Sequence, residues 1–429
     1  MAILPPGFIA DRSGNFGIMT ALLMVPLLGM AGMAVDFAHA MSLRTQLFAA
    51  ADAAAVGSIA EKSGAVAAAM TMSGNGTISL GKTDARSIFL SQVSGELADV
   101  NVDLGIDVTK TANKLNSQVS FTAVVPTTFM RVLGKDSITI SGTATAEYLT
   151  ASFMDFYILL DNTPSMGVGA TATDVATMEK NTSDSCAFAC HETQNKNNYY
   201  NLAKKLGVSM RIDVVRQATK ELTLTAKSTR VSDNQFRMGV YTFGTKAEDA
   251  KLTTISDPTI DLDKVRSYTD AVDLMTIPYQ GYNNDQQTSF DSALTQMKDI
   301  ITTPGDGSTA ASPQKILFFV SDGVGDSEKP KGCTKKLSGN RCQEPIDTSF
   351  CQPLKDKGIR IAVLYTTYLP LPKNSWYNTW IKPFQGEIPT RMQACASPGL
   401  YFEVTPTEGI ADAMKALFLK AIRAPRITS

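Results

Sequence analysis

The sequence has little of what most catalytic centres are built from. Its 429 residues include two histidines, His39 and His191, which argues against a multi-histidine metal centre or a histidine relay. The motifs of phosphate-binding loops, dinucleotide-binding turns, zinc hydrolases and serine-hydrolase elbows do not occur. Its 40 basic and 41 acidic side chains give a net charge of -1, which offers no general attraction to nucleic acid. We therefore expect a protein that is not an enzyme and does not bind nucleic acid.

Cysteine is absent before residue 186, although six cysteines follow. They are Cys186, Cys190, Cys333, Cys342, Cys351 and Cys395. An even number confined to one part of the chain indicates disulfides, and therefore an oxidising compartment. Cys333 and Cys342 flank a charged insertion that a local bridge would close, which leaves Cys351 and Cys395 to pair across neighbouring elements. Six cysteines allow fifteen pairings, so the connectivity stays open.

Cys186 and Cys190 precede His191 in a C-x3-C-H pattern, one residue longer than the motif that attaches c-type haem. Haem also needs an apolar pocket and often a second axial ligand. Zinc would need more ligands, which Cys333 and Cys342 provide only if two insertions meet. A disulfide is the favoured interpretation, and a metal- or haem-dependent periplasmic enzyme is the alternative from another functional class.

Charge is also missing from a long stretch near the start. The nineteen residues 17–35 are all apolar or small, close to the roughly 20 that cross a bilayer as a helix. We expect a short cytoplasmic segment, 1–16, followed by a single transmembrane helix, 17–38. A secretory signal cleaved near Ala38-His39-Ala40 and a buried soluble helix are the alternatives. The cysteines favour a position outside the cytoplasm for the rest of the chain.

Residues 39–150 are predicted to form a long helix followed by a small sheet. Helix formers dominate residues 40–70, and eleven of the 21 residues from Ala49 to Ala69 are alanine. A shorter helix is expected at 85–97. Near-alternating segments rich in Val, Ile, Thr and Phe predict strands at 100–108, 118–125 and 137–148. This pattern suggests an α+β region with a structural role.

Residues 151–425 alternate between apolar strand patterns and helix patterns. Strands are expected at 153–160, 236–243, 315–320, 358–365 and 400–404, with helices at 200–228, 290–301 and 407–422. Such alternation predicts a mostly parallel, doubly wound α/β sheet. In these sheets, ligands bind outside the carboxyl ends of the strands, where the strand order switches.

Two loops leave the carboxyl ends of the strands expected in the middle of the sheet. Together with the segment before one helix, they supply two carboxylates and three hydroxyls: Asp161, Thr163, Ser165, Thr288 and Asp322. A set of hard oxygen ligands suits Mg²⁺, with Ca²⁺ or Mn²⁺ as alternatives. Mg²⁺ prefers about six ligands, so this incomplete set leaves a position for a partner's carboxylate. Alternatively, Asp161 and Ser165 only cap a helix.

The D-x-T-x-S loop, the threonine before the helix and the Ser321-Asp322-Gly323 sequence resemble the metal-ion-dependent adhesion site of von Willebrand factor A domains. The resemblance implies a Rossmann-like fold and Mg²⁺-dependent binding of protein partners, usually without catalysis. Thr163 stands where the family usually has serine, which keeps the hydroxyl but crowds the site. Pro164 is a second departure, because proline fixes the loop backbone.

The first part of the chain is similar to the TadE/TadG-like pilus-assembly proteins. An apolar span ends at Val35-Asp36, and the alanine-rich 43–55 follows. Together with a C-terminal A-type domain, this pattern resembles the TadG type of the Tad/Flp pilus machinery. The resemblance implies a single-pass inner-membrane protein, mostly periplasmic, with pilin-like subunits as partners. The alternative is a pilus-tip or surface adhesin, exposed on the cell if incorporated in a pilus.

Overall fold

The computed structural model describes residues 15–93, 100–249, 251–280, 282, 287–329, 332–338, 341–405 and 409–423. Most of the expected cytoplasmic segment 1–16, the end of the helix expected at 85–97 and the start of the one expected at 407–422 therefore lie outside the described residues. The chain divides into two compact units, residues 1–150 (unit 1) and 151–429 (unit 2).

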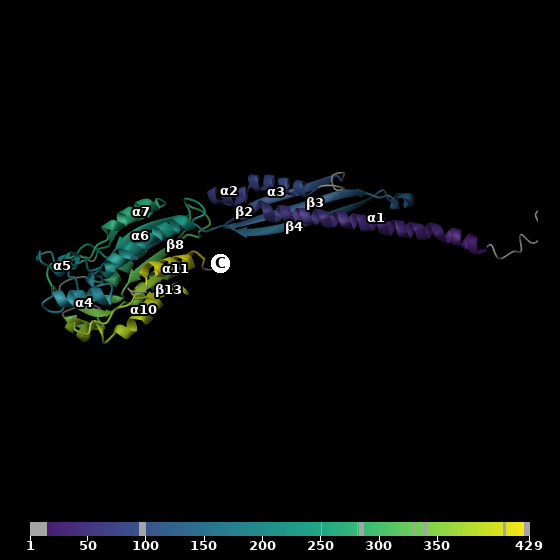
Figure 1. Ribbon diagram of the computed structural model, residues 1–429. Helices are drawn as coiled ribbons and strands as arrows, with labels where there is room; N and C mark the ends of the chain where they lie inside the picture. Colours follow the sequence, from purple (N-terminus) through teal and green to yellow (C-terminus); the bar gives the residue numbers. More distant parts are fainter. Residues whose placement is uncertain are drawn as a thin grey trace, which may run out of the picture. The chain divides into compact units, whose positions relative to one another are not determined.

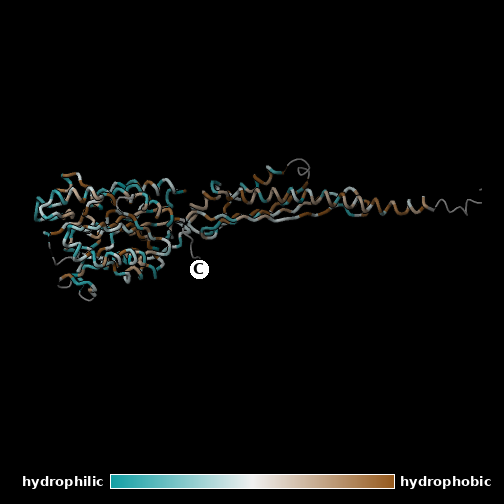
Figure 2. The backbone as a smooth tube through the Cα atoms, turned by 60° about the horizontal axis from the view of Figure 1, so that its bottom comes forward, coloured by the Kyte–Doolittle hydropathy of each residue, from teal (hydrophilic) through white to brown (hydrophobic). Residues whose placement is uncertain are grey.

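Unit 1 is organised around one long helix, α1 (Asn15–Ser58). The helix is long and apolar enough to span a membrane. Its first half exposes large apolar side chains, including Leu22 at 71% and Val25 at 74%. Figure 2 shows this stretch as mainly hydrophobic. The second half instead buries small and apolar residues, among them Leu43, Leu47 and Ala51, against the sheet of unit 1.

A four-stranded antiparallel sheet completes unit 1 (Figure 1). Its order is β1-β2-β3-β4, with β1 at Gly76–Thr77, β2 at Val102–Thr111, β3 at Lys114–Pro126 and β4 at Ser137–Leu149. Two shorter helices, α2 (Gly64–Thr71) and α3 (Ser79–Gln92), also belong to the unit. The three predicted strands are present, whereas two helix predictions were imprecise. The long helix stops at Ser58 because a turn precedes the α2 cap at Ser63, and α3 begins six residues before Ala85.

Unit 2 is built on a six-stranded sheet in the order β13-β12-β8-β5-β6-β7. The strands are β5 (Met154–Leu160), β6 (Phe236–Thr242), β7 (Thr253–Thr259), β8 (Gln314–Ser321), β12 (Arg360–Thr366) and β13 (Tyr401–Val404). Counted within the unit this order is 3-2-1-4-5-6, which is that of Rossmann-like sheets. Only β7, which the sequence did not predict, runs antiparallel, at the edge next to β6. The predicted Rossmann-like α/β fold is confirmed.

Helices cover both faces of this sheet, so alternate residues of β5 enter different cores. Phe156 and Ile158 face a core shared with α6 (Arg211–Thr229), α7 (Leu262–Tyr268) and α11 (Ile410–Arg423). Tyr157 and Leu159 face a core shared with α8 (Phe290–Ile300), α9 (Gln352–Asp356) and α10 (Ile388–Cys395). Because both faces of β5 are buried, its sequence is a nearly continuous apolar run, with Asp155 as the exception.

The helix expected at 200–228 is in fact two helices. α5 (Tyr199–Leu206) ends at Gly207, whose φ of 69° is left-handed and suits glycine. The chain is then extended up to Met210, and α6 begins at Arg211. A further helix, α4 (Ala172–Asn181), precedes them in the insertion that follows the first candidate loop. The break matters because it places Arg211, whose side chain is buried, at the start of α6.

A second, three-stranded sheet follows β8. β9 (Val324–Glu328) and β10 (Lys336–Ser338) both pair with β11 (Arg341–Pro345). A disulfide links Cys333 to Cys342 beside this sheet, and a second links Cys351 to Cys395. These two predicted pairings are confirmed. Cys186 and Cys190 remain thiols, so their disulfide stays a prediction.

We expect the Cys351–Cys395 bridge to contribute more stability than the Cys333–Cys342 bridge, because it spans 44 residues rather than 9. The Cys351→Ala/Cys395→Ala variant should lose about 2–4 kcal/mol in free energy of unfolding. Fluorescence during denaturant unfolding reports on this unit directly, since both tryptophans, Trp376 and Trp380, lie between the two cysteines. The matched Cys333→Ala/Cys342→Ala variant should lose less, and an equal or greater loss would contradict the expectation.

Candidate metal centre

The candidate site lies where the strand order of unit 2 switches direction. β5 and β8 are adjacent and parallel, with Leu160 opposite Val320. The first candidate loop therefore begins at Asp161 beside the end of β8, where Asp322 follows. Two carboxylates that are far apart in the sequence are brought to one edge of the sheet by strand pairing alone.

Short hydrogen bonds fix the first loop around the Asp161 carboxylate. One oxygen, Oδ1, accepts hydrogen bonds from the Thr163 amide at 3.0 Å and from the Thr163 hydroxyl at 2.6 Å. The other, Oδ2, accepts one from the Ser321 hydroxyl at 2.5 Å. The Thr163 and Ser165 hydroxyl oxygens are 3.3 Å apart. Pro164 then begins a short 3₁₀ turn, a position that tolerates a missing amide hydrogen.

Asn162 attaches this loop to the neighbouring strand. Its side-chain amide donates to the Gly244 carbonyl at 2.8 Å and to the Asp273 carbonyl at 3.0 Å. Its side-chain oxygen accepts a hydrogen bond from the Phe243 amide at 3.1 Å. Both polar atoms of the buried Asn162 side chain thus serve the architecture through three hydrogen bonds, which leaves Asp161 and the hydroxyls for chemistry.

The second carboxylate, Asp322, is held between backbone and side-chain donors. The Val324 amide donates to its Oδ1 at 3.1 Å, and the Ser165 side chain also hydrogen bonds to it. Its Oδ2 is 3.3 Å from Nη1 of Arg211. Ser165 therefore links the two candidate loops.

Both carboxylates are fully buried, and the folded structure disfavours their charged forms. Burial, and then the neighbouring Asp322 carboxylate, raise the pKa of Asp161 to about 7. Burial also raises the pKa of Asp322, although Arg211 opposes this shift. Two close, buried carboxylates repel each other unless a cation lies between them. The site is therefore deficient in positive charge.

A buried aspartate at the other end of β5 provides the contrast. The carboxylate of Asp155 accepts hydrogen bonds from Nε and Nη2 of Arg237, both at 2.6 Å, and from Nζ of Lys315 at 2.8 Å. One carboxylate there has two cationic partners. At the candidate site, the described residues provide one cationic contact for two carboxylates, the longer one between Asp322 and Arg211.

Arg211 is the least expected member of the site. Its side chain is 0% exposed, and its guanidinium carbon lies 4.7 Å from the ring centroid of Tyr368. Its Nε and Nη2 find no hydrogen-bond partner within the part of the chain that the structure describes. A buried charge with unused donors is costly, so Arg211 only partly neutralises Asp322.

Thr288 is held by backbone hydrogen bonds to β9 and is connected to the other candidate ligands through a cavity that it shares with Ser165. It exchanges two backbone hydrogen bonds with Asp326, at 2.7 and 3.1 Å, which ties the start of α8 to β9. Thr288 and Ser165 line the same cavity of about 270 Å³. Apolar side chains, among them Phe188, Val324 and Ile381, form part of its wall.

The donor set fits a hard divalent cation. All five predicted side chains offer oxygen, four of the five are buried, and Asp161, Thr163, Ser165 and Asp322 are joined by hydrogen bonds. Thr288 shares the cavity with Ser165. The capping alternative does not account for this arrangement, because Asp161 binds the side chains of Thr163 and Ser321 as well as backbone.

Sequence reasoning missed three residues that shape the site: Asn162, Arg211 and Ser321. Asn162 and Ser321 each stand directly beside one of the candidate carboxylates, and this position was a usable signal. Arg211 gave no signal, because an arginine at the start of a polar helix is normally exposed.

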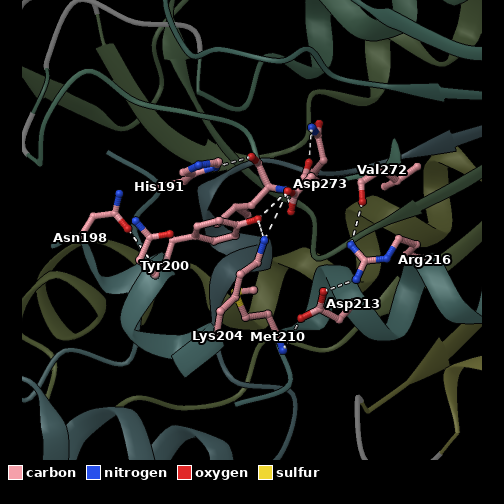
Figure 3. A network of polar contacts seen from close by, with 12 residues as sticks. His191, Asn198, Tyr200, Lys204, Met210, Asp213, Arg216, Val272 and Asp273 are labelled. Carbon is pink, nitrogen blue, oxygen red and sulfur yellow. Dashed lines mark hydrogen bonds and ion pairs between the residues drawn. The ribbon is translucent and has the colours of Figure 1, made fainter. Parts of the chain in front are cut away.

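The histidine of the C-x3-C-H pattern has a structural role. Its Nδ1 lies 3.0 Å from the Leu274 carbonyl oxygen, and its ring stacks on Tyr200 at 3.9 Å. Figure 3 shows Tyr200 and Lys204 converging on Asp273, with the Tyr200 hydroxyl 2.5 Å from the carboxylate. The zinc alternative loses two of its ligands, because Cys333 and Cys342 are bonded to each other.

The comparisons with known proteins concern both parts of the chain. Residues 14–60 match the family described as putative Flp pilus-assembly TadE/G-like. No curated protein sequence matches the chain.

Several solved structures are similar to this chain at low identity. One is the von Willebrand factor domain of the type V pili tip protein Mfa5 from Porphyromonas gingivalis, at 11% identity and a TM-score of 0.34, covering 65% of this chain and 99% of that one. Another is the pilus adhesin SpaC from Lactobacillus rhamnosus GG, at 11% identity and a TM-score of 0.36, covering 77% of this chain and 35% of that one. A third is a mutant of the PilB minor pilin from Streptococcus sanguinis, at 10% identity and a TM-score of 0.35, covering 77% of this chain and 79% of that one.

The Rossmann-like assignment rests on the strand order of unit 2 rather than on these similarities. Residues 14–60 match the TadE/G-like Flp pilus-assembly family, so this part of the chain is a domain of that type. The match supports a pilus-related role for the protein.

Proposed function

We propose that this protein is a membrane-anchored component of Tad/Flp pilus assembly whose unit 2 binds a protein partner through a divalent cation, without catalysis. The observation that carries the proposal is the pair of buried carboxylates, Asp161 and Asp322, surrounded by hydroxyls and short of positive charge. Pilin-like subunits are the expected partners, since the chain carries a pilus-assembly domain.

The membrane anchor is the first half of α1. Its large apolar side chains are exposed in unit 1, so water is an unfavourable environment for this segment. Two disulfides in unit 2 favour an oxidising compartment, which in this arrangement is the periplasm.

Asp161, Thr163, Ser165, Thr288 and Asp322 would hold the cation, with Mg²⁺ preferred and Ca²⁺ or Mn²⁺ as alternatives. When bound, the cation supplies a positive centre with coordination positions left for an acidic side chain of the partner. The cavity beside Ser165 and Thr288 gives that side chain access. The role of the chain's own residues is to hold the site rigid and dry around it.

The metal is tested by calorimetry with Mg²⁺ on the full-length chain in detergent. Wild-type protein should bind, and Asp161→Asn and Asp322→Asn should each abolish the binding heat, because each removes a carboxylate. Asp270→Asn is the matched control, since Asp270 forms an exposed ion pair with Lys220. Equal binding by the two site variants and the control would refute the site.

The positive charge of Arg211 should lower the affinity of the site for the cation. The guanidinium of Arg211 lies 3.3 Å from Asp322 and would repel a cation held by that carboxylate, so Arg211→Met should lower the Kd for Mg²⁺ at least about tenfold. Arg216→Met is the control, because Arg216 bonds Asp213 and the Val272 carbonyl instead. Weaker Mg²⁺ binding by Arg211→Met would instead mean that the arginine serves to position Asp322.

The role in assembly is tested in cells that make the pilus. Cells producing the Asp322→Asn protein should make fewer pili than cells producing wild-type protein at the same level, because the partner loses its cation. Asp270→Asn again serves as the control. A normal number of pili in cells that produce a variant unable to bind the metal would show that assembly does not need the metal. Cleavage of the protein by protease added to intact cells would favour the surface-adhesin alternative.

A further inference from the structure

The loop between β3 and β4 exposes apolar side chains in unit 1. Phe129 is 50% exposed, Val132 86% and Leu133 58%. Three large apolar groups within five residues are unusual at the tip of a loop between exposed strand ends. Their position relative to α1 indicates what covers them.

This loop lies against the apolar half of α1. A Cβ added at Gly32 would lie 2.5 Å from Cβ of Phe129, and one added at Gly29 would lie 3.9 Å from Cδ1 of Leu133. Glycine at position 32 thus lets the loop backbone approach the helix. Gly29 precedes Asp36 by seven residues, which is about 10 Å along the helix axis.

Both glycines belong to the apolar run 17–35, which is the proposed membrane span. If this run lies in hydrocarbon, a loop in contact with Gly29 and Gly32 lies at the same depth. Its tip would then enter roughly the outer third of a hydrocarbon core about 30 Å thick.

Four consecutive amides of the loop, those of residues 127–130, have partners within the protein, as this depth requires. Backbone groups in lipid must find partners within the protein, because no water is available. The carboxylate of Asp36 accepts hydrogen bonds from the amides of Thr128, Phe129 and Met130 at 3.1, 2.8 and 2.6 Å. The amide of Thr127 donates to the Asp136 carbonyl at 3.0 Å. One side chain of α1 thus serves three consecutive amides of the loop.

The loop carries charged side chains, among them those of Arg131 and Asp136. Nε of Arg131 is 3.7 Å from Oδ1 of Asp136, at the start of β4, and both side chains are largely exposed. An arginine among apolar neighbours at an interface extends its charged end toward water and headgroups while its stem stays in the apolar layer. This direction agrees with Phe129, Val132 and Leu133 entering the lipid.

We propose that residues 127–134 form a second membrane-contacting element, which inserts Phe129, Val132 and Leu133 into the leaflet through which α1 leaves the bilayer. The partner is the lipid bilayer, because the loop is continuous with the span that it contacts. The inference rests on the proposed membrane anchoring of α1. Helix and loop together hold unit 1 at the bilayer by two points instead of one.

The test measures the depth of single tryptophans in liposomes. The two native tryptophans are first replaced by Trp376→Phe and Trp380→Phe in the full-length chain, and one reporter is then added: Val132→Trp in the loop, Val25→Trp in the span, or Leu90→Trp on α3. Leu90 is the matched control because it is an exposed apolar residue, at 53%, of the same unit. Each protein is reconstituted into phosphatidylcholine liposomes with and without bromine on the acyl chains.

Brominated lipid should quench the fluorescence of the Val25→Trp and Val132→Trp proteins and leave that of the Leu90→Trp protein unchanged. Quenching at position 25 without quenching at 132 would overturn the loop insertion while the anchor stands; the apolar loop would then face another protein. Absence of quenching at position 25 would refute the anchor, and the loop proposal with it. Equal quenching at 90 and 132 would also overturn the proposal, because the loop would be no deeper than α3.

Discussion

The pairing of β5 with β8 is the constraint on which unit 2 depends. Because the strands are parallel and adjacent, their carboxyl ends bring Asp161 and Asp322 together although more than 150 residues separate them. The pairing buries both carboxylates beneath helices on the two faces of the sheet, and burial raises their pKa values. The remaining features of the site, including the Ser321 hydrogen bond and the buried Arg211, respond to that concentration of negative charge.

The two ends of β5 illustrate two ways to bury a carboxylate. Asp155 is paired by Arg237 and Lys315 at short distances, which makes it a structural ion network. Asp161, which directly follows β5, has hydroxyl and amide partners, and the neighbouring Asp322 at the end of β8 has one long contact with an arginine whose Nε and Nη2 are unused among the described residues. The same element therefore has a saturated end and an unsaturated end, and the unsaturated end is the one that opens toward a cavity through Ser165 and Thr288.

Much of this architecture could be predicted from the sequence, because its strands carry strong local signals. The run Phe153–Leu160, interrupted only by Asp155, and residues 316–320 before Asp322 are nearly continuous apolar segments, a pattern typical of buried parallel strands. The break at Gly207 escaped prediction because apolar residues continue at helical spacing across it, while the left-handed glycine ends α5. Arg211 escaped because its burial depends on the contact with Tyr368, which is distant in sequence. The antiparallel strand β7 is half-buried and contains Pro258, so its pattern was weak.

The β3–β4 hairpin has a mechanical consequence for the whole protein. Its register runs without a bulge from Pro126 opposite Ser137 to Lys114 opposite Leu149. Thirteen residues of strand extend about 40 Å, so Thr150 lies that far from the loop that contacts α1. With the loop end at a lipid surface, as proposed, the hairpin would act as a spacer that sets the height of Thr150 above that surface. Shortening or lengthening β4 by pairs of residues would change this height and preserve which side chains face α1.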